Sequence, residues 1–403
     1  MSAELPAVAR TILAHDHGRD PARLSLKYAK IQASPFAFLR ATPFLYFANC
    51  PLPDALAAAP RSWLCGDLHL ENFGAYRGDN GLVYFDVNDF DEAALGPVGL
   101  DLGRMVTSML VAARESAWPA ATWNDAVDCY VQSYAETLAS GKPRWIERRT
   151  ARGPVRRLLR QLARRRQRTL VKARTIGAGT KRRLIKDGVH ALPATAAERA
   201  RVSGLVRTMA RGDTEFAGFR PLDVARRIAG TSSLGAERYV ILIDRAGAPD
   251  GARLLDLKTE ARPASLVAGT QAGPFRSDAE RTVTVQSVVQ AIPPTGLSAQ
   301  TLGRTHFVLR GLQPSEDRMN IERLVDAAEF RAFATDLGCL TAWMHLRGAG
   351  RFGAAGVEDL MAFGRRRDWR RALVAHARAA RATTLAQYRE FAVLNPALLV
   401  PGG

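Results

Sequence analysis

Apolar residues change their spacing along the chain, and this change divides it into helix-rich and strand-rich stretches. Residues 97–117 and 122–140 carry apolar positions at helical spacing and predict two helices. From about residue 222 to 315, short apolar runs bounded by Gly, Asp and Pro predict strands instead. After about residue 320 helical spacing returns. We therefore expect a mixed α+β protein in which a sheet-rich part lies between two helix-rich parts.

Three local patterns add detail. Residues 82–86, "LVYFD", predict a short buried strand. Residues 153–175 place leucine and valine on one approximate helical face and arginine on the others, which predicts an amphipathic helix. Residues 181–193 predict a hairpin with Asp187 and Gly188 at its turn, because Asp-Gly favours a two-residue turn.

The positive charge of the chain is concentrated in one segment. The formal net charge is +18, and residues 142–186 hold 18 Lys or Arg against a single acid, Glu147. Such a segment predicts an anionic partner, which would be nucleic acid, a membrane surface or an acidic or phosphorylated substrate. Trp145 is its only aromatic residue, which disfavours base stacking. The alternative is a solvated helical face that only joins two halves of the fold.

Length and composition narrow the class of protein. With 403 residues the chain is too long for one compact core and suits two or three packed units. It contains no uncharged apolar run of about 18 residues, so we expect no transmembrane segment. The first 20 residues lack the pattern of a secretory signal. Four widely separated cysteines favour a reduced, cytoplasmic protein.

Two short acidic segments carry the candidate chemistry. The first acidic segment, residues 65–74, reads "CGDLHLENFG" and contains Asp67 and Asn72 at the spacing D-x-x-x-x-N. The second acidic segment, residues 85–93, reads "FDVNDFDEA" and follows the predicted strand. Carboxylate and amide oxygens are ligands that Mg²⁺ prefers, and Mg²⁺ also binds substrate phosphates. An acid-rich strand end near such a loop predicts a phosphate-transferring site, whereas either segment alone could be an ordinary turn.

These residues resemble two known groups of proteins. Together with "GPVGLDLGRM", the two acidic segments resemble the catalytic half of the protein-kinase-like superfamily, especially its aminoglycoside and choline phosphotransferases. More closely, "SPFAFLR", "GDLHLENFG" and "NDFDE" in this order resemble a bacterial family of unknown function over most of the chain. This chain has Cys65 at the position where the phosphotransferases usually have a His before Gly-Asp.

The resemblance implies roles for individual residues. Asp67 would act as the base on the acceptor hydroxyl, and Asn72 would hold a metal ion. A second metal ligand would come from the second acidic segment, where Asp89 fits the downstream spacing best and Asp86 and Asp91 remain alternatives. Asp101, which begins a predicted helix, is interpreted as a helix cap.

Segments that resemble the nucleotide-binding parts of a kinase occur late in the chain. Gly230 and Gly235 flank a turn with Ser232 and Ser233, whose backbone N–H groups could cradle phosphates. Lys258 lies on a following strand, where the resemblance implies a phosphate clamp. Residues 306–312, with Leu309 and Gly311, resemble the strand and hinge that hold adenine, and Glu280 is the predicted ion-pair partner of Lys258. The alternative is that residues 222–315 form an unrelated small sheet.

The order of these parts implies a circularly permuted, protein-kinase-like two-lobe fold. We expect residues 1–221 to begin a helical catalytic lobe, 222–315 to form a smaller antiparallel nucleotide lobe, and 316–403 to complete the first. The predicted function is ATP- and Mg²⁺-dependent phosphoryl transfer to a small-molecule or protein acceptor. The alternatives are transfer of AMP, or a catalytically weak pseudokinase that binds partners through residues 142–186. In each case the segment Leu340–His345 should end near Trp63 and Leu64, where the permutation would have cut the chain.

Overall fold

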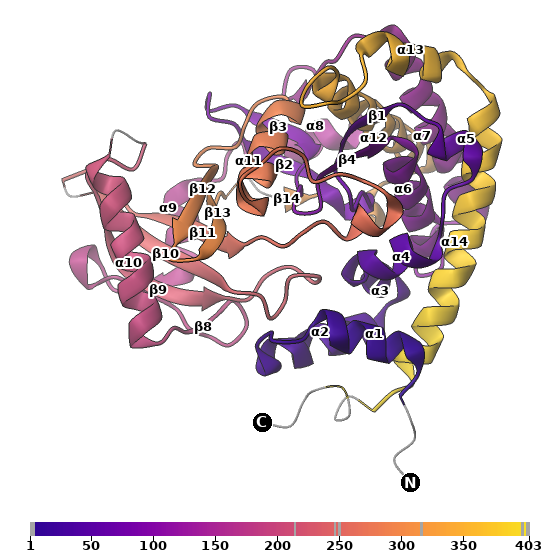
Figure 1. The fold of residues 1–403 in the computed structure, drawn as a ribbon. Coiled ribbons are helices and arrows are strands. Elements are labelled where there is room, and N and C mark those ends of the chain that lie inside the picture. The colour runs from indigo at the N-terminus through magenta and orange to yellow at the C-terminus, as the bar shows by residue number, and fades with distance from the viewer. Residues whose placement is uncertain are drawn as a thin grey trace.

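A helical body and a sheet-rich part lie side by side in the structure (Figure 1). The computed structural model describes residues 5–212, 215–245, 247–248, 251–314, 317–395 and 399. Helices and antiparallel sheets are both extensive, which confirms the mixed α+β class. Among the helices that the structure describes, none combines the length and hydropathy needed to cross a bilayer. All four cysteines are free thiols.

The chain begins with five short helices, which proline and polar caps start and stop. Pro21, Pro35 and Pro43 each open a helix, where a missing N–H is not needed. Ser34 ends one helix and caps the next by accepting from the backbone N–H of Ala37. These helices are α1 (Ala7–His15), α2 (Pro21–Ala33), α3 (Pro35–Ala41), α4 (Pro43–Asn49) and α5 (Asp54–Ala57).

The helical body joins segments from both halves of the chain around one large core. Helix α7 packs against α12, and Gly338 makes the close approach possible. A Cβ at Gly338 would lie 2.1 Å from the hydroxyl of Ser133 and 2.4 Å from the carbonyl of Tyr130. The helices are α6 (Gly99–Ala112), α7 (Ala120–Ser140), α8 (Gly153–Leu162), α12 (Ala327–Gly348), α13 (Val357–Arg365) and α14 (Asp368–Ala392).

Small antiparallel sheets are attached to this body. One is a two-stranded ribbon, β1 with β4, and the other has the strand order β14-β2-β3-β5. Strand β3 confirms the strand predicted at residues 82–86. The strands are β1 (Arg61–Leu64), β2 (Phe73–Arg77), β3 (Val83–Val87), β4 (Ala94–Pro97), β5 (Ile146–Glu147) and β14 (Asp317–Arg318).

The sheet-rich part is a six-stranded antiparallel sheet with the order β12-β13-β11-β10-β9-β8. Helix α10 (Ala196–Arg211) covers one face, where apolar side chains alternate along each strand. Helix α9 (Gln167–Arg174) covers one end of the opposite face. Helix α11 (Asp278–Val289) connects strands on the side of the helical body. The strands are β8 (Ala191–Pro193), β9 (Phe219–Arg227), β10 (Arg238–Arg245), β11 (Arg253–Thr259), β12 (Ser298–Leu302) and β13 (Thr305–Gly311).

Two local predictions were wrong. The helix expected over 153–175 breaks between α8 and α9, because only Ala163 offers an apolar side chain between Leu162 and Leu170. The turn at Asp187–Gly188 forms, but its flanking strands do not pair with each other. Strand β7 (Arg183–Leu184) pairs with β6 (Thr175–Ile176), and β8 joins the large sheet. That sheet therefore uses residues before 222, and the expected boundary at 315/316 lies outside the described residues.

The end of α12 lies against β1, where the sequence analysis expected it. The hydroxyl of Ser62 donates to the carbonyl of His345 at 3.0 Å. The indole N–H of Trp63 donates to the carbonyl of Arg351 at 2.9 Å. Two segments almost 300 residues apart therefore meet at the start of the first acidic segment.

Candidate active site

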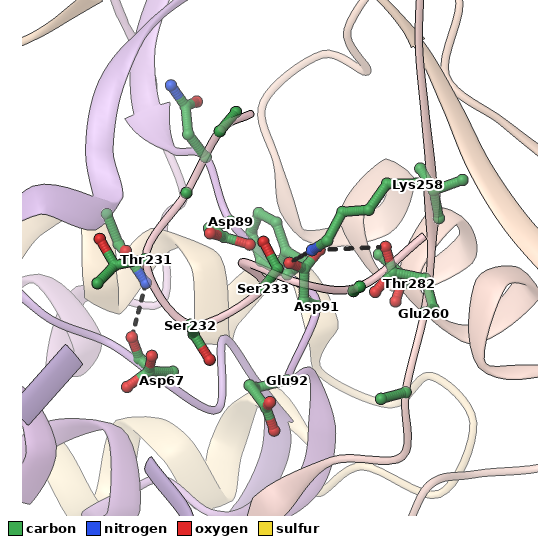
Figure 2. Close-up of a pocket in the computed structure, with 18 of the residues that line it drawn as sticks. Asp67, Asp89, Asp91, Glu92, Thr231, Ser232, Ser233, Lys258, Glu260 and Thr282 are labelled. Atoms are coloured by element: carbon green, nitrogen blue, oxygen red, sulfur yellow. Dashed lines mark hydrogen bonds and ion pairs between the residues drawn. The ribbon is translucent and has the colours of Figure 1, made fainter. Parts of the chain in front are cut away.

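A cavity of about 590 Å³ lies where the helical body meets the six-stranded sheet. Its wall contains both acidic segments, the turn after β9 and the end of β11. Lys258 and Asp89 are 169 residues apart in the chain and both line it. Figure 2 shows Asp89 between Asp67 and Lys258, with Thr231, Ser232 and Ser233 beside them. The structure thus brings the central predicted residues together.

Asp101 holds the first acidic segment in place. Its carboxylate accepts from the backbone N–H groups of Cys65 at 2.9 Å and Gly66 at 3.0 Å. The ring of His345 lies 3.2 Å from the same carboxylate. Gly66 has φ +85°, and a Cβ there would overlap the carbonyl of Glu92 at 1.8 Å. Asp101 therefore positions the loop, whereas the sequence analysis interpreted it as a helix cap.

Asp67 is paired with a buried arginine that the sequence analysis missed. Arg104 donates from Nε at 2.8 Å to one carboxylate oxygen of Asp67, and its Nη2 forms an ion pair with the same oxygen at 2.7 Å. Burial raises the pKa of Asp67 to about 6, although Arg104 opposes that rise. Arg104 is itself fixed, because it donates to the carbonyl of Leu39 and lies 4.8 Å from the ring centre of Tyr46. A basic residue inside a mostly apolar helix was the available signal.

Asn72 and Asp89 are held at the cavity through Cys65. The amide nitrogen of Asn72 donates to the carbonyl of Asp67 at 2.6 Å and to the Cys65 sulfur at 3.6 Å. The Cys65 thiol in turn donates to the carbonyl of Asp89 at 2.9 Å. Burial holds the pKa of this thiol well above its usual range, so it remains a protonated donor. Cys65 thus links the two acidic segments.

These contacts leave oxygen atoms for a cation. Because the Asn72 nitrogen is engaged, its carbonyl oxygen is the atom suited to a metal, together with the Asp89 carboxylate. Both are hard oxygen donors of the kind that Mg²⁺ takes. No group of three or more His, Cys, Asp or Glu side chains among the described residues is arranged to hold a metal by itself. A Mg²⁺ here would need oxygen atoms from a substrate phosphate, which is how Mg²⁺ is commonly bound.

Lys258 pairs with Asp91 across the cavity (Figure 2). Glu260 lies farther away, with a carboxylate oxygen 3.9 Å from the ammonium nitrogen. The predicted partner Glu280 does not reach Lys258, because its carboxylate accepts from the backbone N–H of Arg276 at the start of α11. Asp91 therefore takes the place predicted for Glu280.

Asp86 lies away from the cavity and serves the packing of the body. It is buried, and its carboxylate accepts from the backbone N–H of Ala291 at 3.1 Å and from Arg347 at 3.2 Å. Burial raises the pKa of Asp86, and these donors offset part of the rise. Of the three carboxylates considered as metal ligands, Asp89 and Asp91 line the cavity.

The turn between β9 and β10 is the predicted glycine-containing turn. Gly230 and Gly235 have φ +80° and +88°, a conformation that glycine adopts without strain. Gly230, Ser232 and Ser233 line the cavity, whereas Gly235 faces Arg19 and Leu24 instead.

The N-terminal helices hold this turn, which the sequence analysis did not anticipate. Arg19 donates to the carbonyl of Ser232 at 2.7 Å, and Arg23 donates to the carbonyl of Ala236 at 2.9 Å. The backbone N–H of Asp20 donates to the carbonyl of Gly235 at 3.1 Å. The turn is therefore fixed by the segment between α1 and α2.

Strand β13 presents other residues to the cavity than expected. Leu309 is buried in the core beneath α10, and Gly311 lies next to the carbonyl of Thr295. Val308 and Arg310 line the cavity instead, because side chains alternate between the two faces of a strand. The choice of face could not be read from a short apolar run.

The cavity face of the sheet also carries three arginines around one carboxylate. Asp256 is buried, and Arg227, Arg238 and Arg310 all contact it. The distances from their nitrogens to the Asp256 carboxylate are 2.5, 2.5 and 3.2 Å respectively. We call these four residues the arginine cluster. Arg227 ends β9 and Arg238 begins β10, so the sequence did not set them apart from other charged residues at strand ends.

The family of the chain follows from its sequence. A family described as "Uncharacterized protein conserved in bacteria (DUF2252)" matches residues 19–393. The chain belongs to this family. Membership confirms the expected resemblance to a bacterial family of unknown function, and the DUF2252 match contains both acidic segments, Lys258 and the arginine cluster. Comparison with curated proteins found no match. Comparison with solved structures found none either.

Proposed function

We propose that this DUF2252 protein is an ATP- and Mg²⁺-dependent phosphotransferase with a circularly permuted kinase-like fold. One observation carries the proposal. Asp67, Asn72 and Asp89 line the same cavity as Lys258 and the glycine-containing turn, although these parts are far apart in the chain and in reversed order. The contact between the end of α12 and β1 supports the permutation.

Each residue has a role in this proposal. Asp67 accepts the proton of the acceptor hydroxyl, and Arg104 orients its carboxylate. Asn72 and Asp89 would hold Mg²⁺, which would neutralise developing charge on the phosphates. Lys258 exchanges Asp91 for phosphate oxygens, and the backbone of the turn at 230–233 donates to them. Positioning and electrostatics then supply most of the rate enhancement.

A second candidate is transfer of AMP by the same fold. The arginine cluster favours it, because part of the wall where adenine would be expected carries guanidinium groups beside Val308. In AMP transfer the β- and γ-phosphates leave as pyrophosphate, and the guanidinium groups would suit them. The α-phosphorus would then lie near Asp67. A pseudokinase remains the third reading and predicts nucleotide binding without turnover.

Nucleotide binding provides the first test. We expect ATP with Mg²⁺ to raise the Tm of the protein, and ATP alone to raise it less, because two cavity oxygens would lack their metal. Lys258→Met should remove most of the shift, whereas the exposed Lys30→Met should leave it unchanged. An absence of any shift at millimolar ATP would contradict all three readings.

Labelled ATP separates the readings. Label at the γ-phosphate should appear on the acceptor in phosphoryl transfer, and label at the α-phosphate in AMP transfer. Acceptors would be screened among small metabolites and proteins, because the cavity does not identify one. Asp67→Asn should abolish turnover but retain the nucleotide-induced Tm shift, since the base acts on the acceptor. Asp79→Asn, an exposed matched control, should remain active.

A further inference from the structure

Three guanidinium groups of the arginine cluster share a single carboxylate, that of Asp256. Arg238 forms a two-point contact with Asp256, from Nε at 2.8 Å and Nη2 at 2.5 Å. Arg227 reaches the same carboxylate with Nη1 at 2.5 Å, but not in hydrogen-bond geometry. Within the described part of the chain, this buried nitrogen therefore has no hydrogen-bond acceptor. Arg310 adds a third contact at 3.2 Å.

The local charges show the same imbalance. Burial would raise the pKa of Asp256, but the surrounding guanidiniums outweigh it and hold that pKa well below its usual range. Asp256 is thus an anion at any ordinary pH. Burial lowers the pKa of Arg227 to about 10, even with Asp256 beside it. A buried guanidinium that shares its carboxylate with another cation is stabilised by any further anion that reaches it.

We propose that Arg227, Arg238 and Arg310 form a phosphate-binding subsite on the sheet side of the cavity. The inference rests on the proposed function and deepens it, because it assigns this place to a phosphate group of the donor that is not transferred. Guanidinium forks match the oxygen geometry of phosphate and bind it in two-point fashion. The Nη1 of Arg227, which is ion-paired with Asp256 but makes no hydrogen bond, supplies a donor for such an oxygen.

The register of the sheet sets the subsite next to the proposed phosphate clamp. Arg238 on β10 lies directly opposite Lys258 on β11, and Asp256 is two residues earlier on the same face. Neighbouring strands lie about 5 Å apart, so a chain of two or three phosphates can contact both groups. Phe90 is the only Phe, Tyr or Trp among the described residues that line the cavity. The wall is therefore better suited to phosphate than to stacking of a base.

Binding of inorganic pyrophosphate and tripolyphosphate tests the subsite without any turnover. Calorimetry on the full chain, without Mg²⁺ and at low salt, should show both anions binding, the longer one more tightly. Arg227→Gln should weaken tripolyphosphate binding about tenfold or more, the loss of one charge-assisted contact. Arg227→Lys should recover only part of the affinity, because it restores the charge but not the fork. Arg220→Gln, an exposed arginine on the same strand, is the matched control and should bind like the wild type.

Two outcomes would overturn the subsite and leave the proposed function standing. One is unchanged affinity in Arg227→Gln while Lys258→Met loses binding. The other is equal weakening by Arg220→Gln, which would indicate only general charge. Conversely, if anion binding depends on Arg227 but ATP neither stabilises the protein nor is turned over by it, the subsite would stand and the proposed function would be rejected. If Arg227→Gln does not fold, Arg310→Gln takes its place, and Tm values identify that case.

Discussion

Asp101→Asn is the sharpest test of how the first acidic segment is held. The aspartate is 1% exposed and accepts two backbone hydrogen bonds, from Cys65 and Gly66. An asparagine of the same shape keeps one acceptor oxygen and turns an NH₂ group toward the other N–H. The substitution therefore removes one charge-assisted bond and leaves one buried donor unpaired.

The magnitude follows from these contacts. A hydrogen bond to a charged group is worth about 1.5–3 kcal/mol, and an unpaired buried donor costs about 1–3 kcal/mol. The contributions overlap, since both describe the same N–H group, so we expect a loss of about 3 kcal/mol in the free energy of unfolding. With an m-value of roughly 3 kcal/mol per M, the urea midpoint would fall by about 1 M.

Urea denaturation followed by tryptophan fluorescence measures this loss, and Asp54→Asn provides the control. Asp54 is exposed and begins the short helix α5, so its substitution should change the midpoint little. In a turnover assay, Asp101→Asn should also lose about 100-fold in rate, because the loop that carries Asp67 is displaced. A loss of stability below about 0.5 kcal/mol would refute the argument that Asp101 holds the loop.

Three other predictions concern the cavity and the basic segment. The rate of transfer should rise with pH through about 6, because Asp67 must be deprotonated to accept a proton and burial has raised its pKa to about 6. Glu92→Gln should keep this pH profile. A rate that stays constant from pH 5 to 7 would contradict the role of Asp67 as the base. Arg19→Ala should increase hydrogen exchange in the turn at residues 230–236, because it removes the hydrogen bond to the carbonyl of Ser232. Unchanged protection would show that the turn is stable without this contact. Three exposed arginines lie on and just after α8, namely Arg156, Arg160 and Arg164. Replacing them by Gln should make the affinity for an anionic partner depend less on salt, which affinity measurements at several salt concentrations would show. An unchanged salt dependence would favour a helical face that is only solvated.

The sequence was sufficient to predict that the two acidic segments, the glycine-containing turn and Lys258 meet at the cavity. Asp67 and Asn72 lie in a recognisable spacing, and Lys258 follows a glycine-containing turn on a strand, so their types and order carried the information. The large elements were also predictable, because apolar periodicity persists over many residues in α7 and α12.

The pairings inside the cavity depended on geometry that no single-sequence pattern encodes. Asp91 and Glu280 are both acids near Lys258 in the expected fold, and only the path of the chain selects Asp91. The arginine cluster depends on the register of β9, β10, β11 and β13, because a shift by one residue would turn those side chains to the other face. Leu309 was assigned to the wrong face for the same reason.

The meeting of β1 with the end of α12 has a consequence for how the protein is made. The bond between Ser62 and His345 spans 283 residues, and synthesis proceeds at about 5–20 residues per second, so the first partner waits on the ribosome for roughly 15 to 60 seconds. During that time the face of α7 that packs on α12 lacks its cover, and Asp101 lacks His345. The nascent chain therefore carries the first acidic segment long before it can hold it, and this segment takes its final form only after the end of α12 has been made.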